Sequence, residues 1–178
     1  MMRRFLPLLP LVALAAEPVS EIKIGERLPK LSGEFLAGQA AVLPQVAAGR
    51  VALLLLGFTY KSRFSVEPWA QRFRAQFRSD PRVTFYEVPM IGGWGRLAKW
   101  WIDGGMRRGT PKEDYEHVIT VYRDASPWKP LVRFDDPDAA YLILLDRTSK
   151  VAWLYRGAFD DTAFEALCSK VSELASAQ

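Results

Sequence analysis

Two kinds of apolar pattern alternate along this chain of 178 residues. The first is a short apolar run, typical of a strand that is covered on both faces, and residues 51–56 (VALLLL) show it most clearly. The second is an apolar residue at every third or fourth position, which is typical of a helix that faces a core. Strands are predicted at 41–44, 51–56, 83–88, 117–122, 141–145 and 151–155, whereas 126–138 fits neither pattern.

Three helices are predicted between and after these strands. The apolar stripes are Val66, Trp69, Phe73 and Phe77 in the first helix, and Phe164, Leu167, Cys168, Val171 and Leu174 in the last. The middle helix is predicted at 96–102 and should end at the pair Gly104-Gly105, because glycine commonly terminates helices. Thr162 and Glu165 predict a capping box at the start of the last helix.

The order of these elements predicts an α/β fold. Helices that connect apolar runs favour a central sheet in which neighbouring strands are parallel. The last two strands are separated by a short turn and are expected to form an antiparallel hairpin, which a final helix would cover. Periodicity alone leaves other three-layer α/β folds open.

The first sixteen residues have the composition of a signal peptide. Two arginines precede an apolar stretch at 5–14, and an A-x-A cleavage pattern follows at 13–15. The apolar stretch is shorter than the roughly 20 residues that span a bilayer comfortably. We therefore expect a signal peptide at 1–16 and one domain at 17–178, exported to the periplasm or the outer face of a membrane. An uncleaved membrane anchor is the alternative.

Charge and residue counts exclude several classes of chemistry. The formal net charge of +4 becomes +2 when the two N-terminal arginines are removed, and such a weak excess argues against a nucleic-acid partner. Cys168 is the only cysteine and lies on a helix stripe, where a buried thiol is expected to be inert. His117 is the only histidine, so a Cys-His metal cluster is excluded. We expect no metal and no cofactor, although Asp135, Asp136 and Asp138 offer oxygen ligands for calcium.

The first long strand leads through an aromatic turn into a helix (LLLLGFTYKSRFSVEPW, 53–69). This junction resembles that of thioredoxin-like proteins, where it carries a redox-active cysteine pair. On the CxxxC pattern of the copper-delivering members, Lys61 and Ser65 stand at the cysteine positions, and the family's cis-proline falls near Ala140. The resemblance implies a thioredoxin-like three-layer sandwich, with a central mixed sheet and flanking helices. The former redox-turn positions are Tyr60, Lys61, Ser62, Arg63, Ser65 and Ala140.

The C-terminal half resembles a narrower family, the mitochondrial ATP-synthase assembly factors ("ATP-ten"). The similar segments are GGMRRGTPKEDYEHVITVY (104–122) and DDPDAAYLILLDRTSKVAWLYRGAFDDTAFEAL (135–167). This resemblance implies a redox-inactive chaperone or adaptor, not an enzyme, that helps a membrane protein complex assemble. The family works on the matrix side of the inner membrane, whereas a signal peptide would place this chain on the exported side.

The segment IGGWGRLAKWWIDGGMRRG (91–109) combines tryptophans with basic residues. Trp100 and Trp101 would point about 100° apart on a helix, so one is expected in the core and the other partly exposed. Tryptophan and arginine are enriched at protein interfaces and also suit the membrane–water boundary. The predicted partner-binding residues are Trp94, Arg96, Lys99, Trp100, Trp101, Arg107 and Arg108. The alternative is an insertion helix that packs on the sheet and exposes a solvated basic face.

Three functions remain compatible with these patterns. The chain could be an assembly factor for a membrane or envelope protein, a thiol oxidoreductase or peroxidase relative with a non-standard site, or a membrane-surface protein. Ser62 or Ser65 could act as a nucleophile only beside an activating base. Lys61 and Arg63 could hold an anion at the helix N-terminus. The simplest interpretation of residues 59–65 is that they cap the helix.

Overall fold

The computed structural model describes residues 20–92, 99–123 and 125–177. The predicted signal peptide, Trp94 and Arg96 therefore lie outside the described residues, as does the side chain of Lys99. In the part of the chain that is described, no helix is long and apolar enough to span a bilayer.

The central sheet contains the strands β3 (Val51–Gly57), β4 (Val83–Pro89), β6 (Ala140–Leu145) and β7 (Val151–Gly157). Their order is β4-β3-β6-β7, with β3 parallel to β4 and antiparallel to β6, while β6 and β7 form the hairpin. The predicted mixed sheet is confirmed. Its longest apolar run, β3, lies between two neighbours and is covered on both faces.

A second sheet has the order β2-β1-β5, with β1 at Leu31–Phe35, β2 at Ala40–Leu43 and β5 at Ile119–Thr120. The edge strand β2 was predicted, β1 was not, and β5 is shorter than the predicted 117–122. A Cβ at Gly33 would lie 2.6 Å from a methyl group of Ile119. Glycine is therefore needed where β1 passes β5.

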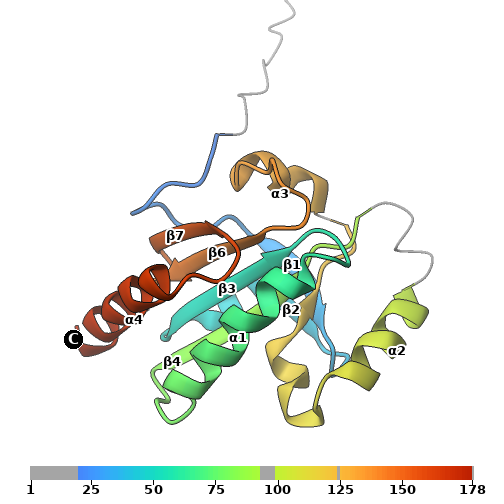
Figure 1. The fold of residues 1–178 in the computed structure, drawn as a ribbon, viewed down its shortest axis with the longest axis horizontal. Helices are drawn as coiled ribbons and strands as arrows, with labels where there is room; N and C mark the ends of the chain where they lie inside the picture. The colour runs from blue at the N-terminus through green and yellow to red at the C-terminus, as the bar shows by residue number, and fades with distance from the viewer. Residues whose placement is uncertain (1–19, 93–98, 124, 178) are drawn as a thin grey trace, which may run out of the picture.

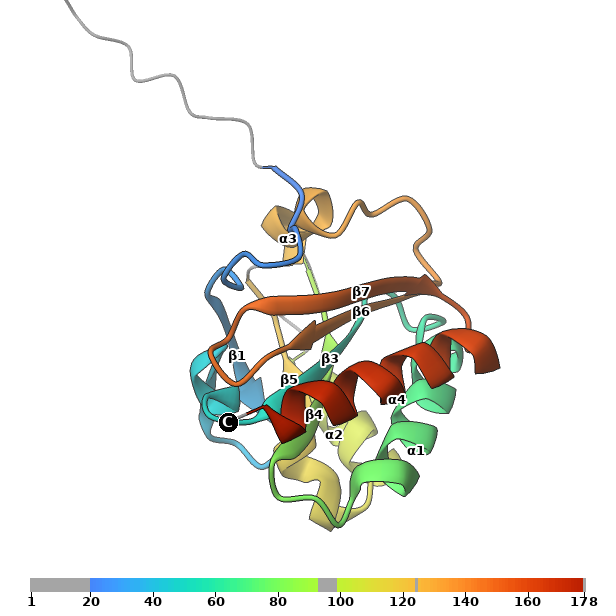
Figure 2. The same cartoon turned by 90° about the vertical axis from the view of Figure 1, so that its left-hand side faces the viewer.

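The helices are α1 (Arg63–Phe77), α2 (Lys99–Gly109), α3 (Ala125–Leu131) and α4 (Asp161–Ser176). Figures 1 and 2 show α1 and α4 running along the same face of the central sheet, with α3 on the opposite side. The segment 126–138, whose pattern was ambiguous, thus begins within α3 and continues as a loop to β6.

The two faces of β3 belong to different cores. Leu53 and Leu55 pack in one cluster with buried residues of α1 and α4, including Trp69. Leu54 and Leu56 pack in the other cluster with β1, β2 and α3. These faces explain the unbroken apolar run, because every side chain of β3 is removed from water.

Two predicted helix ends are wrong. Helix α2 continues through Gly104-Gly105 to Gly109, because glycine weakens a helix by only about 1 kcal/mol per residue and does not forbid it. Helix α4 is capped by Asp160, whose carboxylate accepts from the Ala163 N–H at 2.7 Å, and not by a Thr162–Glu165 box. Asp160 has the extended backbone of an N-cap residue, so the helix begins directly after it.

Candidate functional site

The turn between β3 and α1 closes around the hydroxyl group of Ser62, which is only 1% exposed. This hydroxyl donates to the Thr59 carbonyl at 2.8 Å and accepts from the Thr59 N–H at 3.3 Å, while the Ser62 N–H donates to Thr59 Oγ1 at 3.1 Å. A Cβ at Gly57 would lie 2.5 Å from Ser62 Oγ. The turn therefore requires glycine at the end of β3 and is rigidly held.

The loop that precedes β6 contacts this turn through Asp138. The Thr59 hydroxyl donates to the Asp138 carboxylate at 2.8 Å, and the Ser65 hydroxyl donates to the Asp138 carbonyl at 2.8 Å. Ala140 itself is buried and pairs with Gly157 in the sheet. Asp138 is therefore the residue of this loop that faces the turn. Ala140 lies in the core, although the sequence had placed the family's cis-proline position there.

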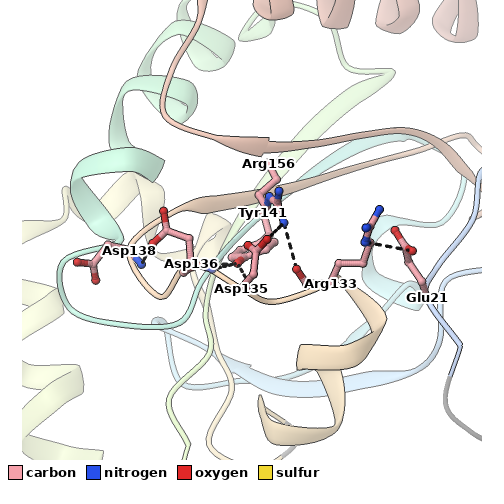
Figure 3. A network of polar contacts seen from close by, with 7 residues as sticks. All are labelled: Glu21, Arg133, Asp135, Asp136, Asp138, Tyr141 and Arg156. Carbon is pink, nitrogen blue, oxygen red and sulfur yellow. Dashed lines mark hydrogen bonds and ion pairs between the residues drawn. The ribbon is translucent and has the colours of Figure 1, made fainter.

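The buried Tyr141 hydroxyl group orders the loop that carries Asp138 (Figure 3). It accepts from the N–H groups of Asp135 and Asp136 at 3.2 and 3.1 Å, and donates to the Asp136 carbonyl at 2.9 Å. Arg156 of β7 pairs with the Asp135 carboxylate. Tyr141 thus holds Asp138 in place beside the turn.

Calcium binding by the three aspartates of this loop is not supported. The carboxylate of Asp135 pairs with Arg156, that of Asp136 accepts from the Asp138 N–H at 2.9 Å, and that of Asp138 accepts from Thr59. Figure 3 shows these side chains pointing in different directions rather than converging. Among the described residues, no group of three or more His, Cys, Asp or Glu could hold a metal ion.

Two aromatic rings and two basic side chains are exposed on the turn. Tyr60 and Phe64 are 77% and 64% exposed. The Arg63 guanidinium lies 5.3 Å from the Tyr60 ring centroid and 5.2 Å from that of Phe64, and also donates to the Tyr60 hydroxyl at 3.0 Å. We call the exposed residues Tyr60, Lys61, Arg63 and Phe64 the turn surface.

Sequence reasoning placed residues 59–65 in the turn, but it missed the exposure of Phe64 and the contact of Asp138 with Thr59 and Ser65. Phe64 had a detectable signal, because it lies off the stripe formed by Val66 and Trp69 and so had to face outward. Asp138 had none, since its contact with the turn spans more than seventy residues.

Two chemical alternatives for the turn find no support in its geometry. The Ser62 and Ser65 hydroxyls donate to backbone carbonyls, and neither has a basic side chain as a hydrogen-bond partner among the described residues. The N–H groups of Phe64, Ser65 and Val66 already donate to carbonyls of Lys61 and Ser62. An anion would therefore compete with satisfied donors at the start of α1.

Cys168 lies on α4, away from the turn in sequence, and is half-buried rather than fully buried as predicted. Burial raises the pKa of its thiol above the ordinary value of 9.0, opposed by Arg72 and reinforced by Glu165. A raised pKa means that little thiolate forms near neutral pH, and the thiolate is the reactive form.

Glu87 of β4 lies near three charged side chains, namely Arg74 and Glu67 of α1 and the buried Asp114. Burial raises the pKa of Glu87 from 4.5 to about 7; the charge of Arg74 opposes this, and the carboxylates of Glu67 and Asp114 add to it. The Arg74 guanidinium pairs with Asp114 at 2.7 Å. Arg74 therefore shares its charge between Glu87 and Asp114, and Glu87 keeps its proton until the pH approaches 7.

Trp100 and Trp101 are both exposed, at 73% and 66%, so the prediction that one of them belongs to the core is wrong. The inward face of α2 is instead occupied by Asp103, which is buried and accepts from the Tyr122 hydroxyl at 2.5 Å. Arg107 also turns toward the body and donates to the Leu36 carbonyl at 2.9 Å. Arg108 remains exposed.

Several solved structures similar to this one come from bacterial proteins described as thiol–disulfide oxidoreductases or thiol peroxidases. A candidate protein disulfide isomerase from Bacteroides thetaiotaomicron has a TM-score of 0.62 at 15% identity, over 89% of this chain and 96% of its own. A candidate thiol:disulfide interchange protein DsbE from Chlorobium tepidum has a TM-score of 0.59 at 16% identity, over 88% and 100%. A thiol peroxidase from Chromobacterium violaceum has a TM-score of 0.56 at 15% identity, over 86% and 91%. No family model and no curated protein matches the chain.

These similarities confirm the thioredoxin-like fold predicted from the turn and the hairpin. They give no support to the narrower resemblance to the ATP-synthase assembly factors. The expectation that the chain is not an enzyme is contradicted, because its structural neighbours are described as thiol–disulfide oxidoreductases and thiol peroxidases. That expectation relied on the missing cysteine pair and on the resemblance to the ATP-synthase assembly factors. Cys168 is the one thiol available for such chemistry.

Proposed function

We propose that this thioredoxin-like protein binds an acidic, partly apolar segment of a protein partner at the turn surface. The observation that carries the proposal is the exposure of Tyr60 and Phe64 on either side of Arg63. Aromatic residues and arginine contribute most of the binding energy at protein interfaces. Here they share a turn that is already rigid, so little conformational entropy would be lost on binding.

Charge supports an acidic partner. Lys61 and Arg63 are both exposed on the turn surface, and the salt bridge between Arg63 and Glu67 at 3.2 Å is itself exposed. An exposed pair of this kind contributes little to stability. A carboxylate on the partner could therefore take the place of Glu67 at low cost and contact Arg63 between the two rings.

Side chains, rather than strand addition, would recognise the partner. Adding a strand requires free backbone donors and acceptors along an edge. At Asp138 the N–H donates to Asp136 and the carbonyl accepts from Ser65, so both backbone groups are already used. The exposed side chains of the turn surface are therefore the groups that would contact the partner.

The assembly-factor role expected from the sequence is one form of this proposal. The partner would then be a subunit of a membrane protein complex or another envelope protein, reached after export. Co-purification from native envelopes tests this form, using the chain, the double variant Tyr60→Ala/Phe64→Ala, and Gln76→Ala as a control on the exposed side of α1. One complex captured by the chain and the control but not by the double variant supports the role; equal capture by all three refutes it.

Thiol chemistry at Cys168 is the second candidate function, and the structural neighbours favour it. A single thiolate can attack hydrogen peroxide to give a sulfenic acid and hydroxide, which takes up a proton to form water. Two molecules of an external thiol then reduce the sulfenic acid back to the thiol, and they leave as a disulfide with a second water. Peroxide consumption in the presence of such a thiol tests this candidate. Activity that Cys168→Ser abolishes supports it, whereas equal rates with and without Cys168 remove it.

A further inference from the structure

Helix α2 contacts the body of the protein through Asp103 and Arg107. The buried Asp103 carboxylate accepts from the Tyr122 hydroxyl at 2.5 Å, and Arg107 Nε donates to the Leu36 carbonyl at 2.9 Å. The Tyr115 hydroxyl donates to the Arg107 carbonyl at 2.8 Å near the end of the helix. These contacts fix the rotation of α2 and determine which face it presents outward.

The outward face combines two indole rings with a cation. Trp100 and Trp101 are largely exposed and contact each other edge to face, with centroids 5.8 Å apart. A Cβ at Gly104 or Gly105 would lie 3.9 Å from the Arg108 guanidinium. The Arg108 side chain therefore runs back over the two glycines, toward the end of the helix that carries the tryptophans.

We propose that this face of α2, made of Trp100, Trp101 and Arg108, binds the surface of an anionic membrane. Indole rings favour the boundary between headgroups and acyl chains, and arginine pairs with lipid phosphates. The sole carboxylate of α2 belongs to Asp103 and faces Tyr122, so α2 brings no acid of its own to the outward face. Charge complementarity thus favours an anionic bilayer, and this proposal is independent of the turn surface.

Partitioning of the full chain into vesicles of phosphatidylcholine, with and without about one-third phosphatidylglycerol, tests the proposal. We expect binding that requires phosphatidylglycerol and weakens between about 0.1 M and 1 M salt, as the Debye length falls from about 10 Å to 3 Å. Arg108→Gln should weaken partitioning by about fivefold, the effect of one basic residue near an anionic surface. Trp100→Ala/Trp101→Ala should weaken it further.

Brominated lipids provide a local readout. Brominated lipids quench the fluorescence of tryptophans that enter the bilayer. The unchanged chain and Trp100→Ala/Trp101→Ala both retain the apolar stretch at 5–14, so the quenching lost in the variant reports on these two rings. Tyr60→Ala/Phe64→Ala is the matched control, because it removes two equally exposed aromatic rings elsewhere. Equal quenching of the tryptophan variant and the unchanged chain, or binding that is indifferent to lipid charge, would overturn the proposal.

Discussion

The Ser65 hydroxyl group donates a hydrogen bond to the carbonyl oxygen of Asp138 at 2.8 Å, joining α1 to a loop 73 residues further along the chain. Together with the Thr59–Asp138 contact, it sets the position of the turn relative to the start of β6.

Ser65→Ala should lower the free energy of unfolding by about 1 kcal/mol, because the partly buried Asp138 carbonyl loses its donor. Urea denaturation measures this change. Ser169→Ala, at an exposed position of α4, is the control and should leave stability unchanged or slightly higher. Equal stability of the Ser65 variant and the unchanged chain would show that the link contributes nothing.

Gly57→Ala should destabilise the protein by about 1–3 kcal/mol, the usual effect of overpacking, because the new methyl group would lie 2.5 Å from Ser62 Oγ. Removing that oxygen should relieve the clash. We therefore expect the double variant Gly57→Ala/Ser62→Ala to be more stable than the sum of the two single changes predicts. Simple additivity in this double-mutant cycle would contradict the proposed clash.

Stability should fall as the pH rises from about 4.5 to about 7, because unfolding releases the proton that Glu87 holds in the folded state. Below this range Glu87 is protonated in both the folded and the unfolded protein, and above it Glu87 is ionised in both. Glu87→Gln should remove the slope and raise stability at pH 8 by about 1–3 kcal/mol, the order expected for a shift of this size. Urea denaturation at a series of pH values measures this slope of the free energy of unfolding. Glu116→Gln, at an exposed position, is the control. An unchanged slope in Glu87→Gln would show that Glu87 does not cause the pH dependence.

Asp160→Ala should destabilise the protein by about 1 kcal/mol, since the Ala163 N–H loses its acceptor at the start of α4. Thr162→Ala is the matched change, because the sequence pattern had assigned the cap to Thr162. Thermal unfolding should show a lower midpoint for the first variant only. A larger fall of the unfolding midpoint in Thr162→Ala than in Asp160→Ala would instead support the predicted capping box.

Alkylation of Cys168 by iodoacetamide at pH 7.5 should be slower in the folded protein than in the urea-unfolded chain. Burial raises the pKa of this thiol, so the thiolate fraction is small in the folded state and increases on unfolding. The folded rate should also rise steeply above pH 9. Fast alkylation of the folded chain at neutral pH would contradict the raised pKa and strengthen the thiol candidate.

Elements with strong local patterns were predictable from the sequence. The run at 51–56 indicated a strand covered on both faces because apolar residues occupied both sides, and β3 has that environment. The stripe of Val66, Trp69 and Phe73 likewise indicated the buried face of α1. In both cases the residues themselves specify what must be removed from water.

Features that depend on distant partners were not predictable. Trp100 and Trp101 are exposed because the Asp103–Tyr122 hydrogen bond sets the rotation of α2, and no spacing reveals that bond. The turn was recognised by its position after β3, but its contact with Asp138 required the fold. Phe64 is the exception, since its place off the helix stripe already indicated exposure.

Photo-cross-linking from the turn surface tests the central claim most directly. A photoreactive phenylalanine analogue would replace Tyr60 in one chain and Gln76, exposed further along α1, in another, with both expressed in native envelopes. We predict that position 60 captures one partner through an acidic, partly apolar segment, that Arg63→Ala abolishes this capture, and that position 76 does not capture it. Identical products from both positions, or capture that persists in Arg63→Ala, would contradict the account.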